Sequence, residues 1–326
     1  MIRRSLAAGA AVLAALAVAS CGGGGGMPTP APRGGGNPAV PTALLALDAG
    51  NAQSAAAGAT LTGLGASSLG TQFQSASVST RAPLPRTHVL TRFIRKQIDG
   101  LTRGLQDSPA VVTGAAVITT PCTVSGSVSL DQGTLSATET FSACSETAGS
   151  SVTGTITIDD MALDPGVSFS GLAGLNLTFS QAGFADVNIT GSNVSVLETV
   201  NVAVNTVTLS GTELFVATGP VTERLGNFTL TATIDTASET DSVTFNYAST
   251  EIGGSVSVAT LTPCVTAAAM NFPNSGVLSL AGAGGSKVQV TVNGDESFAA
   301  SQVTIGVDAD GDGTFETTIG KNWADL

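Results

Sequence analysis

The residues after 110 alternate between apolar and polar side chains with a period of two. The stretch 227–235 reads NFTLTATID, and the stretches SVTFNY and KVQVTV alternate in the same way. This period is typical of β-strands that bury one face and expose the other. More than a dozen such runs follow one another. The pattern therefore predicts a β domain over residues 109–326.

Turn signals separate these runs, among them DPG at 164–166, TGS at 190–192 and NGD at 293–295. No run of helical period interrupts them, which disfavours parallel crossovers and favours antiparallel meanders. One face of the runs carries Val, Leu, Ile and Phe, and the other carries Thr and Ser. We expect a mainly β fold, with a large antiparallel sheet that is curved or barrel-like and a short N-terminal helical segment. A β-solenoid or a sandwich is the alternative, although the asparagines show no fixed solenoid period.

Residues 42–108 are expected to supply that helical segment. The Ala-rich stretch 42–57 predicts one helix, and the stretch 87–105 predicts a second, amphipathic one. Apolar residues recur at helical spacing on one side of the second helix, and cations fall on the other: Leu90, Ile94, Ile98, Leu101 and Leu105 against Arg92, Arg95, Lys96 and Arg103. Such a helix packs its apolar stripe on the β domain, or it binds anionic headgroups at a membrane.

The first twenty residues combine the basic pair Arg3 and Arg4 with an uncharged Ala/Leu/Val run, which is typical of a secretory signal. The following residues, VASC at 18–21, resemble the lipobox of bacterial lipoproteins. The resemblance implies that residues 1–20 are removed and that Cys21 is lipidated. It also implies the outer membrane of a Gram-negative cell, because Gly22 rather than Asp follows the cysteine. Residues 21–41 are rich in Gly and Pro, which predicts a tether between the anchor and the domain.

The charge distribution excludes one class of partner. Residues 108–326 contain three Lys/Arg and twenty-one Asp/Glu, and an acidic surface repels the phosphates of nucleic acids. One Trp and one Tyr also leave few stacking platforms for bases or sugars. The chain lacks a G-x-S-x-G elbow, and GAGGSK at 282–287 lacks the spacing of a phosphate loop. We therefore expect a protein that is not an enzyme.

Three cysteines follow Cys21, and in an exported chain they are expected to form a disulfide rather than a zinc site. A hairpin turning at Gly133 would bring Cys122 and Cys144 together, and this bond would stabilise the fold by roughly 3 kcal/mol. Cys264 is then left over, either buried or intermolecular. Because TPC occurs at both 120–122 and 262–264, a bond between Cys122 and Cys264 is an alternative.

The stretch DADGDG near the C-terminus predicts a metal-binding turn. Three aspartates occupy its first, third and fifth positions, as hard oxygen ligands for Ca²⁺ require. Position twelve is Ile319 instead of Glu, and the flanks alternate like strands, so this is not an EF-hand. The arrangement resembles the calcium hairpin loops of β-propeller repeats, which implies a structural Ca²⁺ and the ligands Asp308, Asp310, Asp312, Glu316 and the Thr314 carbonyl. An exposed turn whose aspartates cap backbone N–H groups is the alternative.

Residues 275–326, preceded by TPC and FPNSG, resemble the C-terminal part of uncharacterised bacterial lipoproteins that end in P-x-x-G, G-A-x-G-S, D-x-D-G-D-G and T/N-W. The hairpin with the two cysteines resembles theirs as well. This family implies no activity. We expect a membrane-anchored lipoprotein facing the periplasm, which binds a lipid or other apolar ligand on a concave face. A structural or surface-interaction envelope protein with a filled core, partnered by another envelope protein, is the alternative, and an enzyme of unknown class is the second alternative.

Overall fold

The computed structural model describes residues 39–67, 117–133, 135–145, 148–164, 168–183, 185–201, 204–267, 270, 272–295 and 297–326. In these residues one α-helix, α1 Ala52–Ser67, precedes fourteen strands. The strands are β1 Val117–Pro121, β2 Ser125–Gln132, β3 Ala137–Ser145, β4 Ser150–Asp164, β5 Ser168–Gln181, β6 Val187–Val200, β7 Asn205–Thr218, β8 Val221–Ile234, β9 Ser238–Ser249, β10 Gly254–Ala267, β11 Ser275–Ala281, β12 Lys287–Val292, β13 Val303–Asp308 and β14 Thr317–Lys321. Two short 3₁₀ turns, η2 Ala283–Gly285 and η3 Trp323–Asp325, complete the described elements.

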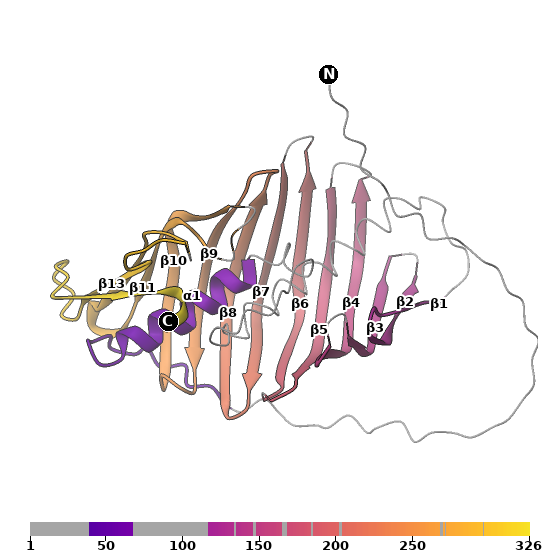
Figure 1. The fold of residues 1–326 in the computed structure, drawn as a ribbon, viewed down its shortest axis with the longest axis horizontal. Helices are drawn as coiled ribbons and strands as arrows, with labels where there is room; N and C mark the ends of the chain where they lie inside the picture. The colour runs from indigo at the N-terminus through magenta and orange to yellow at the C-terminus, as the bar shows by residue number, and fades with distance from the viewer. Residues whose placement is uncertain are drawn as a thin grey trace, which may run out of the picture. The chain divides into compact units, whose positions relative to one another are not determined.

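The strands form one open antiparallel sheet in which each strand pairs with the next along the chain. Figure 1 shows this meander as a row of arrows that runs from β1 to the C-terminal hairpins. In the described residues β1 and β14 are the two edges. The mainly β, antiparallel prediction is therefore confirmed, and the sheet is neither closed on itself nor divided into the layers of a sandwich or the coils of a solenoid.

Bulges bend the long strands. Among the described residues, four other than glycine have a positive φ, namely Ala143, Asp160, Asn193 and Asn227, and all four lie inside strands. Those in β3, β4 and β8 coincide with shifts of pairing register. A bulge bends a strand and increases its twist. The expected turn at 190–192 is wrong for this reason: β6 continues through Thr190 and Gly191 to Val200, with Asn193 as an internal irregularity.

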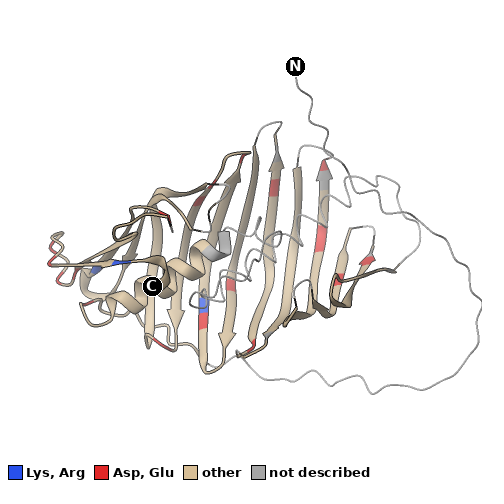
Figure 2. Cartoon of the chain, viewed as in Figure 1, with Lys and Arg blue, Asp and Glu red and all other residues tan. Residues whose placement is uncertain are grey.

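The sheet has an apolar inner face and a hydroxyl-rich outer face. On the inner face, the alternate residues of neighbouring strands pair apolar side chains directly, as in Leu209 with Leu230 and Leu230 with Val243. On the outer face, hydroxyl groups pair in the same way: the Thr208 and Thr231 hydroxyls lie 3.3 Å apart. Figure 2 shows that charged residues are sparse along the strands. The period-two pattern of the sequence therefore sorts side chains between the two faces as predicted.

Helix α1 packs on the inner face, mainly against β8, β9, β12 and β13. Two glycines allow the close approach to β9. A Cβ at Gly58 would meet the Tyr247 hydroxyl, and a Cβ at Gly63 would lie 2.5 Å from the Phe245 ring. The Tyr247 hydroxyl and the Thr62 hydroxyl both donate to Glu223 Oε1, at 2.7 and 3.2 Å. The helix is therefore fixed to β8 and β9 by shape and by the partly buried Glu223 carboxylate.

The helix begins later than the sequence predicts. Residues 42–57 were expected to be helical, but α1 starts at Ala52 because the preceding residues form a tight turn around Asp48. The Asp48 carboxylate accepts the N–H groups of Gly50 and Asn51. The earlier residues are extended instead: the Leu45 N–H donates to the Ser255 carbonyl, and the Leu45 carbonyl accepts the Ala283 N–H. The predicted amphipathic helix 87–105 lies outside the described residues, as do the expected signal sequence, Cys21 and most of the expected tether. In the part that is described, no helix is long and apolar enough to cross a membrane.

The C-terminal residues also pack into the core. Trp323 is buried and stacks on Phe272 with ring centroids 4.9 Å apart. Its indole N–H donates to the Gly294 carbonyl, and its backbone N–H donates to Gln302 Oε1. The single tryptophan thus ties the end of the chain to the β12–β13 connection.

The Gly58→Ala substitution is expected to lower the free energy of unfolding by about 1–3 kcal/mol, because the added methyl group overpacks against Tyr247. This loss exceeds the gain of up to about 1 kcal/mol in helix propensity. Chemical denaturation measures it. Ser54→Ala, on the exposed side of α1, is the matched control and should change stability little. A Gly58→Ala protein as stable as the wild type would contradict the close packing of α1 on β9.

The ionisation of Glu223 is expected to contribute to the pH dependence of stability. Burial raises the pKa of Glu223, and the hydrogen bonds from Tyr247 and Thr62 offset only part of this effect. A carboxyl whose pKa is raised in the folded state binds protons more tightly there, so stability falls as pH rises from the unfolded value of about 4.5 towards the raised one. Denaturation at a series of pH values should show a smaller fall for Glu223→Gln than for the wild type. The exposed control Asp186→Asn should keep the wild-type slope, and equal slopes for all three proteins would contradict the prediction.

Candidate metal centre

The predicted metal ligands come together in the turn between β13 and β14. These strands pair in register from Val303 with Lys321 to Val307 with Thr317, and residues 309–316 form the connection. Gly311 and Gly313 have φ of +77° and +92°, which let the chain turn tightly. A Cβ at Gly311 would lie 2.9 Å from the Gly285 backbone, so the turn rests against η2. The alternating flanks and the glycines thus predicted the local structure correctly.

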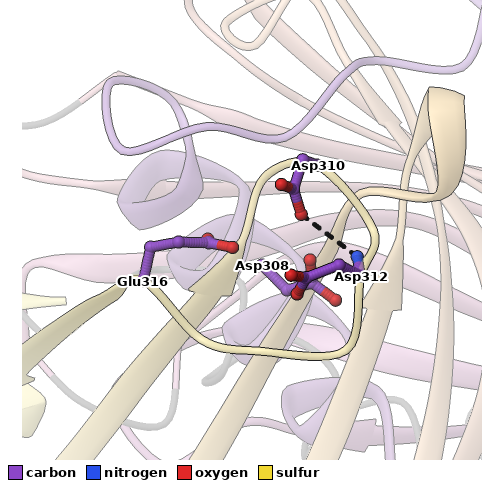
Figure 3. Close-up of side chains that lie close together, drawn as sticks. All are labelled: Asp308, Asp310, Asp312 and Glu316. Atoms are coloured by element: carbon purple, nitrogen blue, oxygen red, sulfur yellow. Dashed lines mark hydrogen bonds between the residues drawn. The ribbon is translucent and has the colours of Figure 1, made fainter.

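Four carboxylates converge in this turn. Each of Asp308, Asp310, Asp312 and Glu316 offers an oxygen that lies within 4.8 Å of the others. Figure 3 shows Asp308 and Asp312 in the middle of the loop, with Asp310 and Glu316 approaching from two sides. Asp308 is buried, whereas the other three are exposed. Carboxylates this close repel one another by about 1 kcal/mol per pair even in a water-like dielectric.

Backbone hydrogen bonds hold the carboxylates in place. Asp308 accepts the N–H of Gly311 at 2.7 Å and that of Gly313 at 3.0 Å. Asp310 accepts the Asp312 N–H, and Asp312 accepts the Thr314 N–H. Glu316 reaches back across the turn and accepts the Ala309 N–H at 3.0 Å. The aspartates therefore cap the backbone of the turn, as in the alternative interpretation, and also leave oxygens facing a common point.

The donor set fits a hard divalent cation. All four side chains offer oxygen, which Ca²⁺ and Mg²⁺ prefer, and none offers the sulfur or nitrogen that zinc sites use. Such an ion would remove the repulsion among the carboxylates. Thr314 lies in the same loop, but the part of its carbonyl in binding stays a prediction. The cluster can hold a metal ion, and the identity of that ion as calcium stays a prediction too.

The predicted disulfide is present. Cys122 bonds to Cys144, with Cα atoms 5.5 Å apart. The β2–β3 hairpin turns at 133–136, where the Gly133 N–H donates to the Ser136 carbonyl, close to the predicted centre. Cys122 lies just before β2 rather than within it, so the bond also ties the β1–β2 turn to β3. The alternative bond between Cys122 and Cys264 is wrong.

Cys264 lies in β10, buried and outside any disulfide. It pairs across the strands with Asp241 of β9. Burial, and to a lesser extent the Asp241 carboxylate, raises the pKa of the Cys264 thiol to about 12. A thiol held in this neutral form is a poor nucleophile, which fits a buried structural role.

Sequence reasoning missed the buried carboxylates of the inner face. Glu139 of β3 and Glu198 of β6 are 8% and 4% exposed. Glu139 pairs across the strands with Ile156, and Glu198 with Phe169 and Val207, so both stand within apolar rows. The alternation in ATETF already places Glu139 on the same face as Ala137 and Phe141. That placement was the available signal, because charged residues are rarely buried without a partner.

No family model, no curated protein and no solved structure matches this chain.

The metal centre predicts a calcium-dependent stability. The wild type should melt at a higher temperature in calcium than in chelator, by the equivalent of about 2.7 kcal/mol at a hundredfold excess over Kd. Asp310→Ala should lose most of this difference while melting like the wild type in chelator. Asp310 is chosen because Asp308 carries two backbone hydrogen bonds, so its removal would disturb the turn with or without metal. Asp186→Ala is the surface control, and equal melting of the wild type in calcium and chelator would remove the metal from the turn.

Proposed function

We propose that the protein is a lipid-anchored protein of the cell envelope that acts without catalysis, as a structural or surface-interaction module. The continuous core carries this proposal. Side chains from α1, from the strands β3 to β13 and from Trp323 form one buried cluster, and its members are at most 9% exposed. Close-packed side chains of this kind serve stability and leave little room for a ligand. Interaction is then the task of the outer face.

The anchor and the tether support the envelope location. Cys21 ends a stretch that resembles a lipobox, and the Gly/Pro-rich residues 22–41 separate it from the described fold. A tether of this composition would let the domain face the periplasm while the lipid stays in the membrane. The Cys122–Cys144 disulfide is also typical of an exported protein. The resemblance favours the outer membrane of a Gram-negative bacterium, because Gly22 rather than Asp follows Cys21.

The metal centre is proposed to bind calcium and to act structurally. Four carboxylates in an irregular turn suit Ca²⁺, which accepts six to eight oxygens in flexible geometry, better than Mg²⁺, which demands a near-ideal octahedron. The turn joins β13 to the edge strand β14 and rests on η2, so an ion there would fix the end of the sheet. Stabilising this edge is the simplest role for the ion.

Binding of an apolar ligand is the second candidate. It is favoured by one observation: the apolar inner face of β3–β7 lies beyond the main contacts of α1. A shallow depression of about 370 Å³ exists on the outer face instead. Its lining includes the polar side chains Asn227, Thr244, Asn246, Ser257 and Ser279. Amides and hydroxyls do not suit a lipid, so the inner face is the only place where this candidate gains support from the described residues.

The proposed function predicts contact through the outer face. A photoreactive amino acid at Thr229, which is exposed on the outer face of β8, should cross-link the protein to a defined envelope component in intact cells. The same label at Thr236, in the β8–β9 turn, is the positional control and should give less product. The Cys21→Ser variant should lose the product with its anchor. Absence of any defined product from Thr229 and from the exposed outer residue Thr153 would contradict a surface-interaction role.

A further inference from the structure

Two neighbouring strands of the sheet lose their pairing over a short stretch. β9 and β10 pair on both sides of a register shift, in which residues 242–246 of β9 stand against the longer stretch 257–263 of β10. Extra residues in one strand form a bulge, which bends the strand and interrupts the ladder of hydrogen bonds. The outer-face depression of about 370 Å³ lies at this interruption. Its volume falls within the range of about 300–1,000 Å³ that is typical of small-ligand sites.

The interruption is a fixed feature of the fold. The Thr260 hydroxyl accepts the Val243 N–H at 2.8 Å and donates to the Val243 carbonyl at 3.2 Å, where a backbone partner would otherwise stand. Next along the strands, Phe245 and Val258 do not pair with each other. Both side chains are buried, and the Phe245 ring packs against Gly63 of α1 on the inner face. These two residues therefore line the outer depression with their backbone groups.

Most polar side chains of the depression have hydrogen-bonding groups available for a ligand. Within the described residues, Asn227, Thr244 and Ser279 make no side-chain hydrogen bond. The Oδ1 atom of Asn246 accepts the Ser257 hydroxyl at 3.0 Å, which leaves the Asn246 amide N–H groups to donate elsewhere. An amide or a hydroxyl can donate and accept at once. Side chains from four strands, β8 to β11, thus offer donors and acceptors to one ligand.

The depression is neutral. No Asp, Glu, Lys or Arg is among its described lining residues. Arg224 lies beside it, over Gly226 of β8, but donates to Glu213 at 2.6 and 3.0 Å. An anionic ligand would therefore find no cation in the lining, and an apolar ligand would leave amides and hydroxyls unpaired. The methyl groups of Ala259 and Ala281 add small apolar contacts.

We propose that this depression binds a neutral oligosaccharide. The inference rests on the proposed surface-interaction role and names the ligand class and the site. Adjacent sugar hydroxyls donate and accept together, which matches the amides and hydroxyls of the lining. The side chains that bind the sugar are Asn227, Thr244, Asn246, Ser257 and Ser279. No exposed aromatic ring is among the described lining residues, so hydrogen bonds and the alanine methyl groups hold the sugar in place of stacking.

Calorimetric titration of the full-length protein, in a detergent without a sugar headgroup, tests the ligand class. The probes are cellotetraose, maltotetraose and the tetramer of N-acetylglucosamine, and tetragalacturonate is the anionic control. At least one neutral probe should bind saturably, and at least about tenfold more tightly than tetragalacturonate. Absence of saturable binding for all the neutral probes would overturn the proposal. Equal or tighter binding of tetragalacturonate would overturn it as well.

Matched glycine variants test the site. Asn227 and Asn193 are both exposed, with φ of +47° and +54°, so glycine can replace either one without backbone strain. Asn227→Gly should weaken sugar binding at least about threefold, because it removes hydrogen bonds to the ligand. Asn193→Gly, on β6 and away from the depression, should bind like the wild type. Wild-type affinity in Asn227→Gly would place the sugar elsewhere and overturn the site.

A second pair of variants tests the same site by blocking it. Ala259→Phe should fill the depression and abolish binding, whereas Thr153→Phe, on the outer face of β4, should leave binding unchanged. The melting temperature of each variant shows that it is folded. Sugar binding by Ala259→Phe at the wild-type affinity would overturn the proposal.

The titration does not depend on the envelope contact that the label at Thr229 reports. A cross-linked protein partner at Thr229, with no sugar bound in the titration, would overturn the sugar site and leave the surface-interaction role intact. Sugar binding that Asn227→Gly weakens, with no cross-linked product in cells, would support the site and contradict that role.

Discussion

The structure depends on covering one face of a single sheet. An antiparallel sheet with an apolar face and no second sheet must bury that face against something else. Here α1 covers the part over β8, β9, β12 and β13, and its glycines at 58 and 63 bring it close enough to exclude water. The extended residues before α1 and the Trp323 end pack beside it. Segments that precede the strands in the sequence and segments that follow them therefore pack into the same core. Each strand, in contrast, pairs only with its neighbours along the chain.

The meander makes the ends of the sheet its weakest points. Edge strands leave backbone groups unpaired and are short here, with five residues each in β1 and β14. Each edge lies next to a local constraint. The Cys122–Cys144 bond ties the β1–β2 turn to β3, and the carboxylate turn at 308–316 joins β13 to β14. A covalent bond at one end and a metal site at the other would restrict fraying where the sheet has fewest neighbours.

The sequence predicted the features that rest on local pattern. Alternation identified the strands and their faces, the symmetry about Gly133 identified the disulfide, and the spacing of Asp308, Asp310 and Asp312 identified the carboxylate cluster. It could not predict features set by tertiary packing. The TGS sequence at 190–192 is typical of a turn, but pairing with β5 and β7 keeps it within β6. Helix α1 starts at Ala52 because Asp48 caps a turn there. Glu139 has the alternation of an inner residue, yet its burial depends on neighbours far away in the chain.

The function follows from how the inner face is used. If the face is core, interaction falls to the hydroxyl-rich outer face, in line with the proposed role as an anchored envelope module. If it is a chamber, the protein carries a ligand. The measurement that separates these is mass spectrometry of organic extracts from the intact protein, with native membrane lipids supplied and a control lipoprotein in parallel. We predict no stoichiometric lipid beyond the proposed anchor on Cys21. A second lipid at one copy per chain, absent from the control, would contradict the assignment of the inner face as core.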